Sequence, residues 1–139
     1  MVRAVFDASA VVSGCGWGAE SYRCLVLVAR RRVSSLATEG IIKEWRETMT
    51  ELQIEDTKFL RDPWPTLEWL IDMSYLVAPA PLGKQRSRDA KDDPYIGCAI
   101  AARAEFVVTR DRDLLDLQKP FGVSIVTPRA FLNQLHKTI

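Results

Sequence analysis

The sequence predicts an α/β fold, a three-layer α/β/α sandwich around a central and mainly parallel sheet. Short apolar runs rich in β-branched residues alternate with longer segments whose apolar residues recur at helical spacing. This β-α-β-α order calls for a parallel sheet with helices on both faces. With 139 residues, the chain suits one domain with a substantial core and is short for two ordinary ones. We therefore expect one domain over residues 1–139.

The first part of the chain contains two expected strands, at 2–6 and 33–37. Between them, glycines at positions 14, 16 and 18 predict a loop, and a helix is expected from about residue 19 to 31. This helix ends in three arginines, where cations favour the negative end of the helix dipole. Thr38 is a suitable N-cap for a helix that runs to about residue 52.

The next segments have similar signals. A helix is expected from near Pro65, followed by a strand at 75–78, and the prolines and glycine between 79 and 88 predict a loop. Pro94 fits the first position of a helix that extends through residue 104, with Asp93 as its N-cap. Further elements are expected at 106–109 (strand), 114–117 (short helix), 123–126 (strand) and from Pro128 (helix).

Composition excludes several classes of protein. A hydrophobic content of 47% with 27% charged residues is typical of a globular protein. The apolar runs are too short to cross a bilayer and the N-terminus has no signal-peptide pattern, so we expect no membrane segment and a cytoplasmic location. The net charge of +1 gives no global field for nucleic acid. Cys15, Cys24 and Cys98 are expected to be buried thiols, and the single histidine, His136, excludes a paired-imidazole mechanism and a multi-histidine zinc site.

Acidic residues occur where this fold gathers functional groups. Asp7 and Asp111 follow two of the strands, and Asp92 and Asp93 precede a helix. Ligands of open parallel sheets bind beyond the carboxyl ends of the strands. Carboxylates that meet there repel one another unless protons or a cation neutralise them, and their hard oxygen atoms suit Mg²⁺ or Mn²⁺. This pattern indicates a metal-dependent phosphodiester hydrolase.

Each acid also has a structural interpretation. Asp7 fits an Asx-turn or a helix cap, although Ser9 and Ser13 are available as local caps. An N-cap explains one of Asp92 and Asp93, and a second cap explains one of Asp111 and Asp113. Glu44 lies at the edge of an apolar helical stripe, at about 100° per residue. Taken alone, it indicates only an amphipathic helix.

The chain resembles the PIN-domain ribonucleases found as toxins in bacterial and archaeal toxin–antitoxin operons. The motifs that carry the resemblance are VFDASAVVS, SSLATEGIIKEWRETM, RDAKDDPYIGCAIAARAEFVVTRDRDLL and GVSIVTPRAFL. They span nearly the whole chain in the order of the family, and the third motif is the most specific. One departure lies in that motif, where Lys91 replaces an acid.

The resemblance implies a role for each acidic position. Asp7, Glu44, Asp93 and Asp111 correspond to the four acids of the family's catalytic site, and Asp92 competes with Asp93 for the third place. These five residues are the implied ligands of Mg²⁺ or Mn²⁺, which activates water for attack on phosphorus. The implied auxiliary residues are Ser9, Thr109 and Asp113. Arg88, Arg110 and Arg112 are weaker candidates for contacts to RNA phosphates, and Trp17 and Tyr95 are expected to pack rather than to stack on bases.

The function implied is a divalent-metal-dependent endoribonuclease, the toxin of a toxin–antitoxin pair. The alternatives are a housekeeping RNA-processing nuclease and a catalytically silent RNA- or protein-binding domain. A flavodoxin-like or receiver-like domain gives no reason for Glu44 or the paired acids. The expected partners are RNA, an antitoxin protein and a second copy of the chain in a homodimer. Apolar residues of the helices at 19–31 and 38–52, with Trp17, are expected to form part of such a surface, unless they all belong to the core. The residues concerned are Leu25, Trp45 and Met49.

Overall fold

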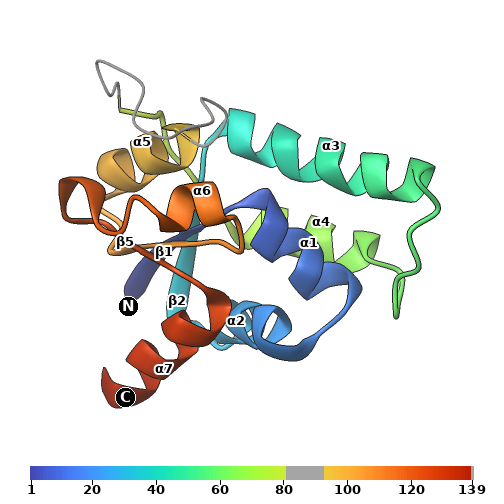
Figure 1. Ribbon diagram of the computed structural model, residues 1–139, viewed down its shortest axis with the longest axis horizontal. Helices are drawn as coiled ribbons and strands as arrows, with labels where there is room; N and C mark the ends of the chain where they lie inside the picture. The colour runs from blue at the N-terminus through green and yellow to red at the C-terminus, as the bar shows by residue number, and fades with distance from the viewer. Residues whose placement is uncertain (81–92, 139) are drawn as a thin grey trace.

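The computed structural model describes residues 1–80 and 93–138 (Figure 1). Its centre is a five-stranded sheet in the order β3-β2-β1-β4-β5, with every neighbouring pair parallel. β1 and β4 pair with Phe6 opposite Val108, so both strands end at the same edge. The strands are β1 (Val2–Phe6), β2 (Val33–Ala37), β3 (Tyr75–Leu76), β4 (Phe106–Val108) and β5 (Ser124–Val126).

Helices cover the sheet on both faces. α5 packs against β1, β2 and β4, whereas α7 packs against β4, β5 and α2 (Figure 1). The expected three-layer α/β/α fold with a parallel sheet is confirmed. The helices of the described residues are α1 (Ala8–Gly16), α2 (Ala19–Ala29), α3 (Glu39–Ile54), α4 (Trp64–Met73), α5 (Asp93–Ala102), α6 (Arg112–Leu115) and α7 (Pro128–Thr138).

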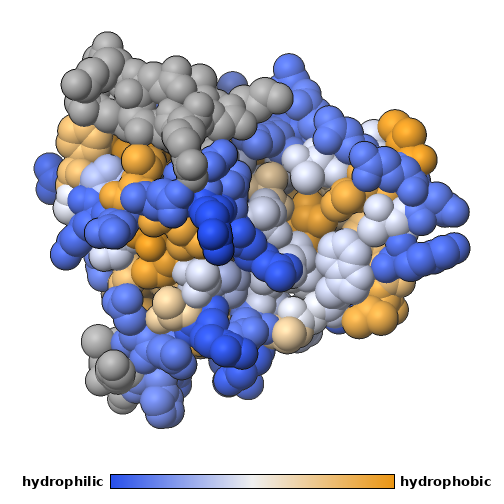
Figure 2. Space-filling model, viewed as in Figure 1, coloured by the Kyte–Doolittle hydropathy of each residue, from blue (hydrophilic) through white to orange (hydrophobic). Residues whose placement is uncertain are grey.

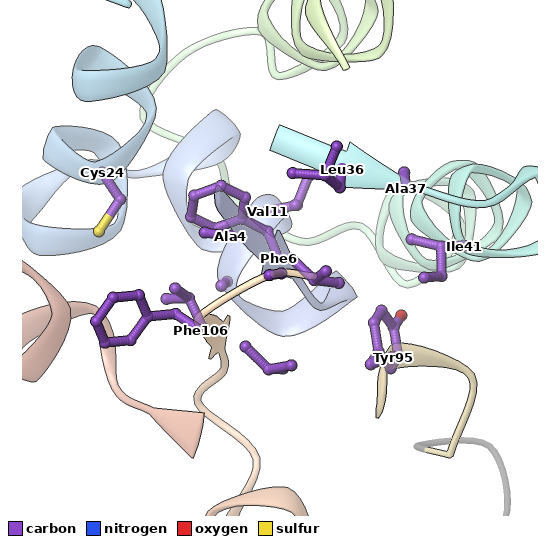
Figure 3. Close-up of a cluster of buried hydrophobic side chains, with 14 of the residues drawn as sticks. Ala4, Phe6, Val11, Cys24, Leu36, Ala37, Ile41, Tyr95 and Phe106 are labelled. Atoms are coloured by element: carbon purple, nitrogen blue, oxygen red, sulfur yellow. The ribbon is translucent and has the colours of Figure 1, made fainter. Parts of the chain in front are cut away.

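Apolar side chains fix these layers to the sheet. Phe131 of α7 lies edge-on to two aromatic rings of the sheet, with ring centroids 6.1 Å from Phe6 and 5.2 Å from Phe106. Figure 3 shows Phe6 on the central strand β1, Phe106 on the neighbouring strand β4, and Tyr95 of α5 beside Ile41 of α3. All these side chains are buried. The core therefore places the carboxyl ends of β1 and β4 close to α3 and α5.

The loop expected at the glycines is wrong, because Gly14 and Gly16 belong to α1. A Cβ atom at Gly14 would lie 2.8 Å from Leu25 Cδ1, and one at Gly16 would lie 2.2 Å from Phe59 Cδ1. These glycines therefore permit close packing within a helix. Other differences are smaller: β3 ends at Leu76, α6 covers Arg112–Leu115 rather than 114–117, and Asp93 is the first residue of α5 rather than a residue before it.

The apolar residues of α2 and α3 that were expected to form part of a partner surface belong to the core instead. Leu25, Trp45 and Met49 have at most 2% of their surface exposed and belong to the core, so they cannot contact a partner. Trp17 is half-buried and packs on Phe59. The large apolar side chains that are exposed include Ile54, the last residue of α3, and Leu60, in the segment after it. Figure 2 shows hydrophobic residues at the right edge of the molecule, the side on which α3 ends in Figure 1.

Other expectations about burial hold. The three cysteines are buried free thiols, and His136 is exposed on α7. Within the described ranges, no helix has both the length and the apolar character that a membrane span requires.

Candidate active site

Asp7 directly follows β1 and is buried, with 4% of its surface exposed. It is the N-cap of α1, since its Oδ1 accepts a hydrogen bond from the backbone nitrogen of Ala10 at 3.0 Å. The same oxygen accepts from Ser9 Oγ at 2.7 Å, and Oδ2 accepts from Thr109 Oγ1. The expectation that serines would cap this helix in place of Asp7 is wrong. Capping uses only Oδ1, so it does not account for the burial of the whole carboxylate.

Two hydroxyl groups connect Asp7 to the segment that follows β4. Thr109 Oγ1 donates to Asp7 and accepts from the backbone nitrogen of Asp111 at 2.9 Å. Ser9 Oγ also donates to Asp7 and accepts from the backbone nitrogen of Arg110 at 2.9 Å. A hydroxyl has one hydrogen and two lone pairs, so each makes both bonds at once. The acids after β1 and β4 are therefore held in a fixed relation.

Burial raises the pKa of Asp7 from its ordinary value of 3.8 to about 6. The three hydrogen bonds from Thr109, Ala10 and Ser9 lower the pKa but do not offset the loss of solvent, and the negative charge of Asp111 raises it further. These described partners are all neutral donors. The ionised Asp7 thus has its orientation fixed while its charge is not compensated by any cation in the described part of the chain.

Glu44 lies on α3, which is fixed to the sheet by the residue next to it. The indole nitrogen of Trp45 donates to the backbone oxygen of Phe6 at 3.0 Å, directly before Asp7. The buried hydroxyl of Tyr95 accepts from the backbone nitrogen of Ala8 at 3.2 Å and donates to Glu44. Burial raises the pKa of Tyr95, and the negative charges of Glu44 and Asp7 raise it further. Glu44 and Asp7 therefore lie near the same phenol.

Tyr95 is the residue of this site that the sequence did not identify. Its hydroxyl and the nitrogen of Ala8 are 87 positions apart in the chain, so no local pattern points to the contact. Its place two residues after Asp93, inside the expected helix, was the only available signal.

The other predicted residues have mixed outcomes. Asp93 and Asp113 are half-buried at the starts of α5 and α6, and Asp111 caps α6 by accepting from the backbone nitrogen of Asp113 at 2.9 Å. Arg112 is exposed. Arg110 is exposed, and its Nη1 donates to Ser13 Oγ at 2.8 Å. Arg88 and Asp92 lie outside the described residues.

The oxygen atoms of this site are of the kind that binds a hard divalent cation. Carboxylate oxygens are the ligands that Mg²⁺ and Mn²⁺ prefer, and the buried charge of Asp7 calls for a cation. Within residues 1–80 and 93–138, however, no three acidic, histidine or cysteine side chains are close enough to hold an ion as a group. The expectation that Asp7, Glu44, Asp93 and Asp111 share one cation stays a prediction.

Comparisons with known proteins identify the family and the fold of the chain. The model of one family, described as the PIN domain, matches residues 3–113. The crystal structure of PAE2754 from Pyrobaculum aerophilum is similar with a TM-score of 0.65 and 18% sequence identity, covering 98% of this chain and 90% of that one. At this identity the likeness shows the fold alone. Curated protein sequences give no match. PIN domains are generally metal-dependent nucleases, so the chain has a nuclease-type fold. The chain belongs to the PIN-domain family.

Proposed function

We propose that this protein is a divalent-metal-dependent endoribonuclease that acts in the cytoplasm as the toxin of a toxin–antitoxin pair. The observation that carries the nuclease proposal is the buried Asp7 carboxylate, which meets only neutral donors and lies beside Asp111 at the carboxyl edge of the sheet. Membership of the PIN-domain family supports the same reaction class. RNA as the substrate is supported by the resemblance of the sequence motifs, which span nearly the whole chain, to the ribonucleases of this family.

The carboxylates proposed to hold Mg²⁺ or Mn²⁺ are Asp7, Glu44, Asp92, Asp93 and Asp111. A bound divalent ion lowers the pKa of water and stabilises negative charge on the leaving oxygen of a phosphodiester. The chain itself supplies orientation. Ser9 and Thr109 fix the Asp7 carboxylate, and Tyr95 holds Glu44 towards the start of α1. Asp113 is proposed to add negative charge at the edge of this site.

The test of the nuclease proposal is cleavage of single-stranded RNA by the purified protein in Mg²⁺ or Mn²⁺, and in EDTA. We expect cleavage only with metal, and its loss in Asp7→Asn and Asp111→Asn. Asn is as good an N-cap as Asp, so α1 and α6 keep their caps. Asp72→Asn, an exposed carboxylate on α4, is the matched control and should retain activity. Cleavage without metal, or full activity of both site variants, would contradict the proposal.

A housekeeping nuclease of the same fold is the competing function. Expression of the protein alone, and together with the product of any small gene adjacent to its own, separates the two functions, because only a toxin should arrest growth alone and be relieved by its antitoxin. Purification and sizing of the co-expressed proteins test the partner and the homodimer. A strictly monomeric protein with no copurifying partner contradicts both the homodimer and the toxin assignment.

A further inference from the structure

A second polar site adjoins the acids on the side of the sheet that α2 and α7 cover. It is a cavity of about 330 Å³ between α1, the first turns of α2 and α7, and the segment after β4. Arg110 connects it to the acids, because its backbone donates to Ser9 Oγ while its guanidinium reaches Ser13 in the cavity wall. Ser13 is four residues from Ser9 on α1, about 6 Å along the helix axis.

The cavity carries net positive charge. Arg110 and Arg129 line it together with one acid, Glu20, whose Oε2 lies 2.6 Å from Arg129 Nε. Two guanidinium groups against one carboxylate leave one positive charge. A guanidinium has five N–H donors in a planar arrangement that matches the oxygens of a phosphate. Around the first turn of α7, the surface in Figure 2 is mainly hydrophilic.

The cavity also presents donors that lack acceptors. Ser21 has 6% of its surface exposed, and its hydroxyl makes no hydrogen bond with any residue that the structure describes. The backbone nitrogens of residues 19–21 are the first of α2 and also have no described acceptor, since the N-cap, Gly18, has no side chain. Of these donors the Ser21 hydroxyl belongs to a buried residue, and a buried polar group without a partner costs about 1–3 kcal/mol. An anion in the cavity would satisfy these donors and meet the positive end of the α2 dipole.

We propose that this cavity is a phosphate subsite, formed by Arg110, Arg129, Ser13, Ser21 and the N-terminus of α2. It rests on the proposed nuclease function, since an RNA strand with its scissile bond at the acids would place a neighbouring phosphate here. Thr109 and Arg110 are consecutive, so one segment orients Asp7 and lines the subsite. A phosphodiester within the strand and a terminal 5′-phosphate present the same chemistry to these donors.

The first experiment titrates metal-free protein with inorganic phosphate and follows backbone amide resonances. The amides of residues 19–21 should shift, and those at the C-terminal end of α2 should not. Ser21→Ala should reduce phosphate affinity about tenfold, as expected for a hydrogen bond to a charged group. Its thermal midpoint should not fall, because the hydroxyl has no described partner to lose. The proposal is overturned if the amides of α2 do not respond.

The second experiment measures binding of a single-stranded RNA oligonucleotide by fluorescence anisotropy in EDTA, where no cleavage occurs. Arg129→Ala should weaken binding and lower the slope of log K against log salt by about 0.7. Arg30→Ala, an exposed arginine at the other end of α2, is the matched control and should bind as the wild type does. Glu20→Gln removes the one acid of the cavity, so it should strengthen binding. The proposal fails if Arg129→Ala matches Arg30→Ala, or if Glu20→Gln weakens binding.

Oligonucleotides with a 5′-hydroxyl or a 5′-phosphate show whether the subsite holds a phosphodiester within the strand or a terminal 5′-phosphate. If Ser21→Ala weakens both equally, the subsite holds a phosphate within the strand. If only the 5′-phosphorylated RNA loses affinity, it holds the terminal phosphate. Phosphate binding at α2 in a protein that cleaves no RNA would refute the proposed function and leave the subsite standing. Normal cleavage with unchanged binding in Ser21→Ala and Arg129→Ala would refute the subsite alone.

Discussion

Asp7→Asn should stabilise the fold at neutral pH while it abolishes the proposed activity. Burial raises the pKa of Asp7 from 3.8 to about 6. At about 1.4 kcal/mol per pKa unit, ionised Asp7 therefore destabilises the folded state by roughly 3 kcal/mol. The asparagine keeps the Oδ1 atom that caps α1 but turns the contact with Thr109 into a donor–donor conflict that costs about 1 kcal/mol to rearrange. The expected net gain is about 2 kcal/mol.

The pH dependence identifies the cause of this gain. Below pH 3.8 Asp7 is protonated in both states and contributes no difference. Between 3.8 and about 6 the folded state keeps a proton that the unfolded state has lost, so the wild-type free energy of unfolding falls as pH rises. Above about pH 6 the whole cost is present. The asparagine cannot ionise, so the advantage of the variant should grow across this window and then remain constant.

Thermal melts in EDTA at several pH values measure the effect. For 139 residues the entropy of unfolding is roughly 0.3 kcal/mol/K, so 2 kcal/mol corresponds to about 7 °C in Tm at pH 8. Asp72→Asn is the control for loss of one exposed carboxylate and should change Tm little. An Asp7→Asn protein that melts at or below the wild-type temperature at pH 8, or an advantage that does not vary with pH, would refute the reasoning.

Three further predictions concern the contacts around the site. Thr109→Val removes the hydroxyl between Asp7 and Asp111, so it should cost about 1–3 kcal/mol in denaturant melts and about 10- to 100-fold in cleavage rate; an unchanged rate would exclude a positioning role. Tyr95→Phe leaves the nitrogen of Ala8 without its acceptor and should lower stability by about 1–3 kcal/mol, whereas Tyr75→Phe on exposed β3 should be neutral; equal melts would contradict the contact. Gly97→Ala places a Cβ 2.8 Å from the backbone oxygen of Ala80 and should destabilise the fold by about 1–3 kcal/mol. Gly40→Ala, whose Cβ has no atom nearer than 3.8 Å, should stabilise the fold by a few tenths to about 1 kcal/mol. A change of the same sign in both variants would contradict the close contact at Gly97.

The sequence predicted those features that depend on local pattern. The apolar runs located all five strands, and turn and cap residues located α3 and α5 to within a few residues. The acids after β1 and β4 could be placed at one edge because parallel strands that follow the β-α-β rule end together.

The features it missed depend on contacts between distant residues. Glycine is a poor helix former by about 1 kcal/mol relative to alanine, so Gly14 and Gly16 predicted a loop. Their place in α1 follows from the close approach of Leu25 and Phe59, which no local pattern reveals. The expectation of an exposed apolar face on α2 and α3 was wrong for a similar reason. α3 buries Trp45 against the end of β1, a contact between residues far apart in the sequence.

The way in which Asp7 is held bears most directly on its function. Orientation alone could be achieved by an arginine, which would also neutralise the buried charge and remove its cost. The chain instead uses two hydroxyls and one backbone nitrogen. The arginine nearest in sequence to Thr109, Arg110, donates to Ser13 rather than to Asp7. Millimolar Mn²⁺ should therefore raise the wild-type Tm by binding the folded state, and do so less in Asp7→Asn, in which residue 7 carries no charge for the ion to neutralise. An equal increase in both proteins would place the ion elsewhere.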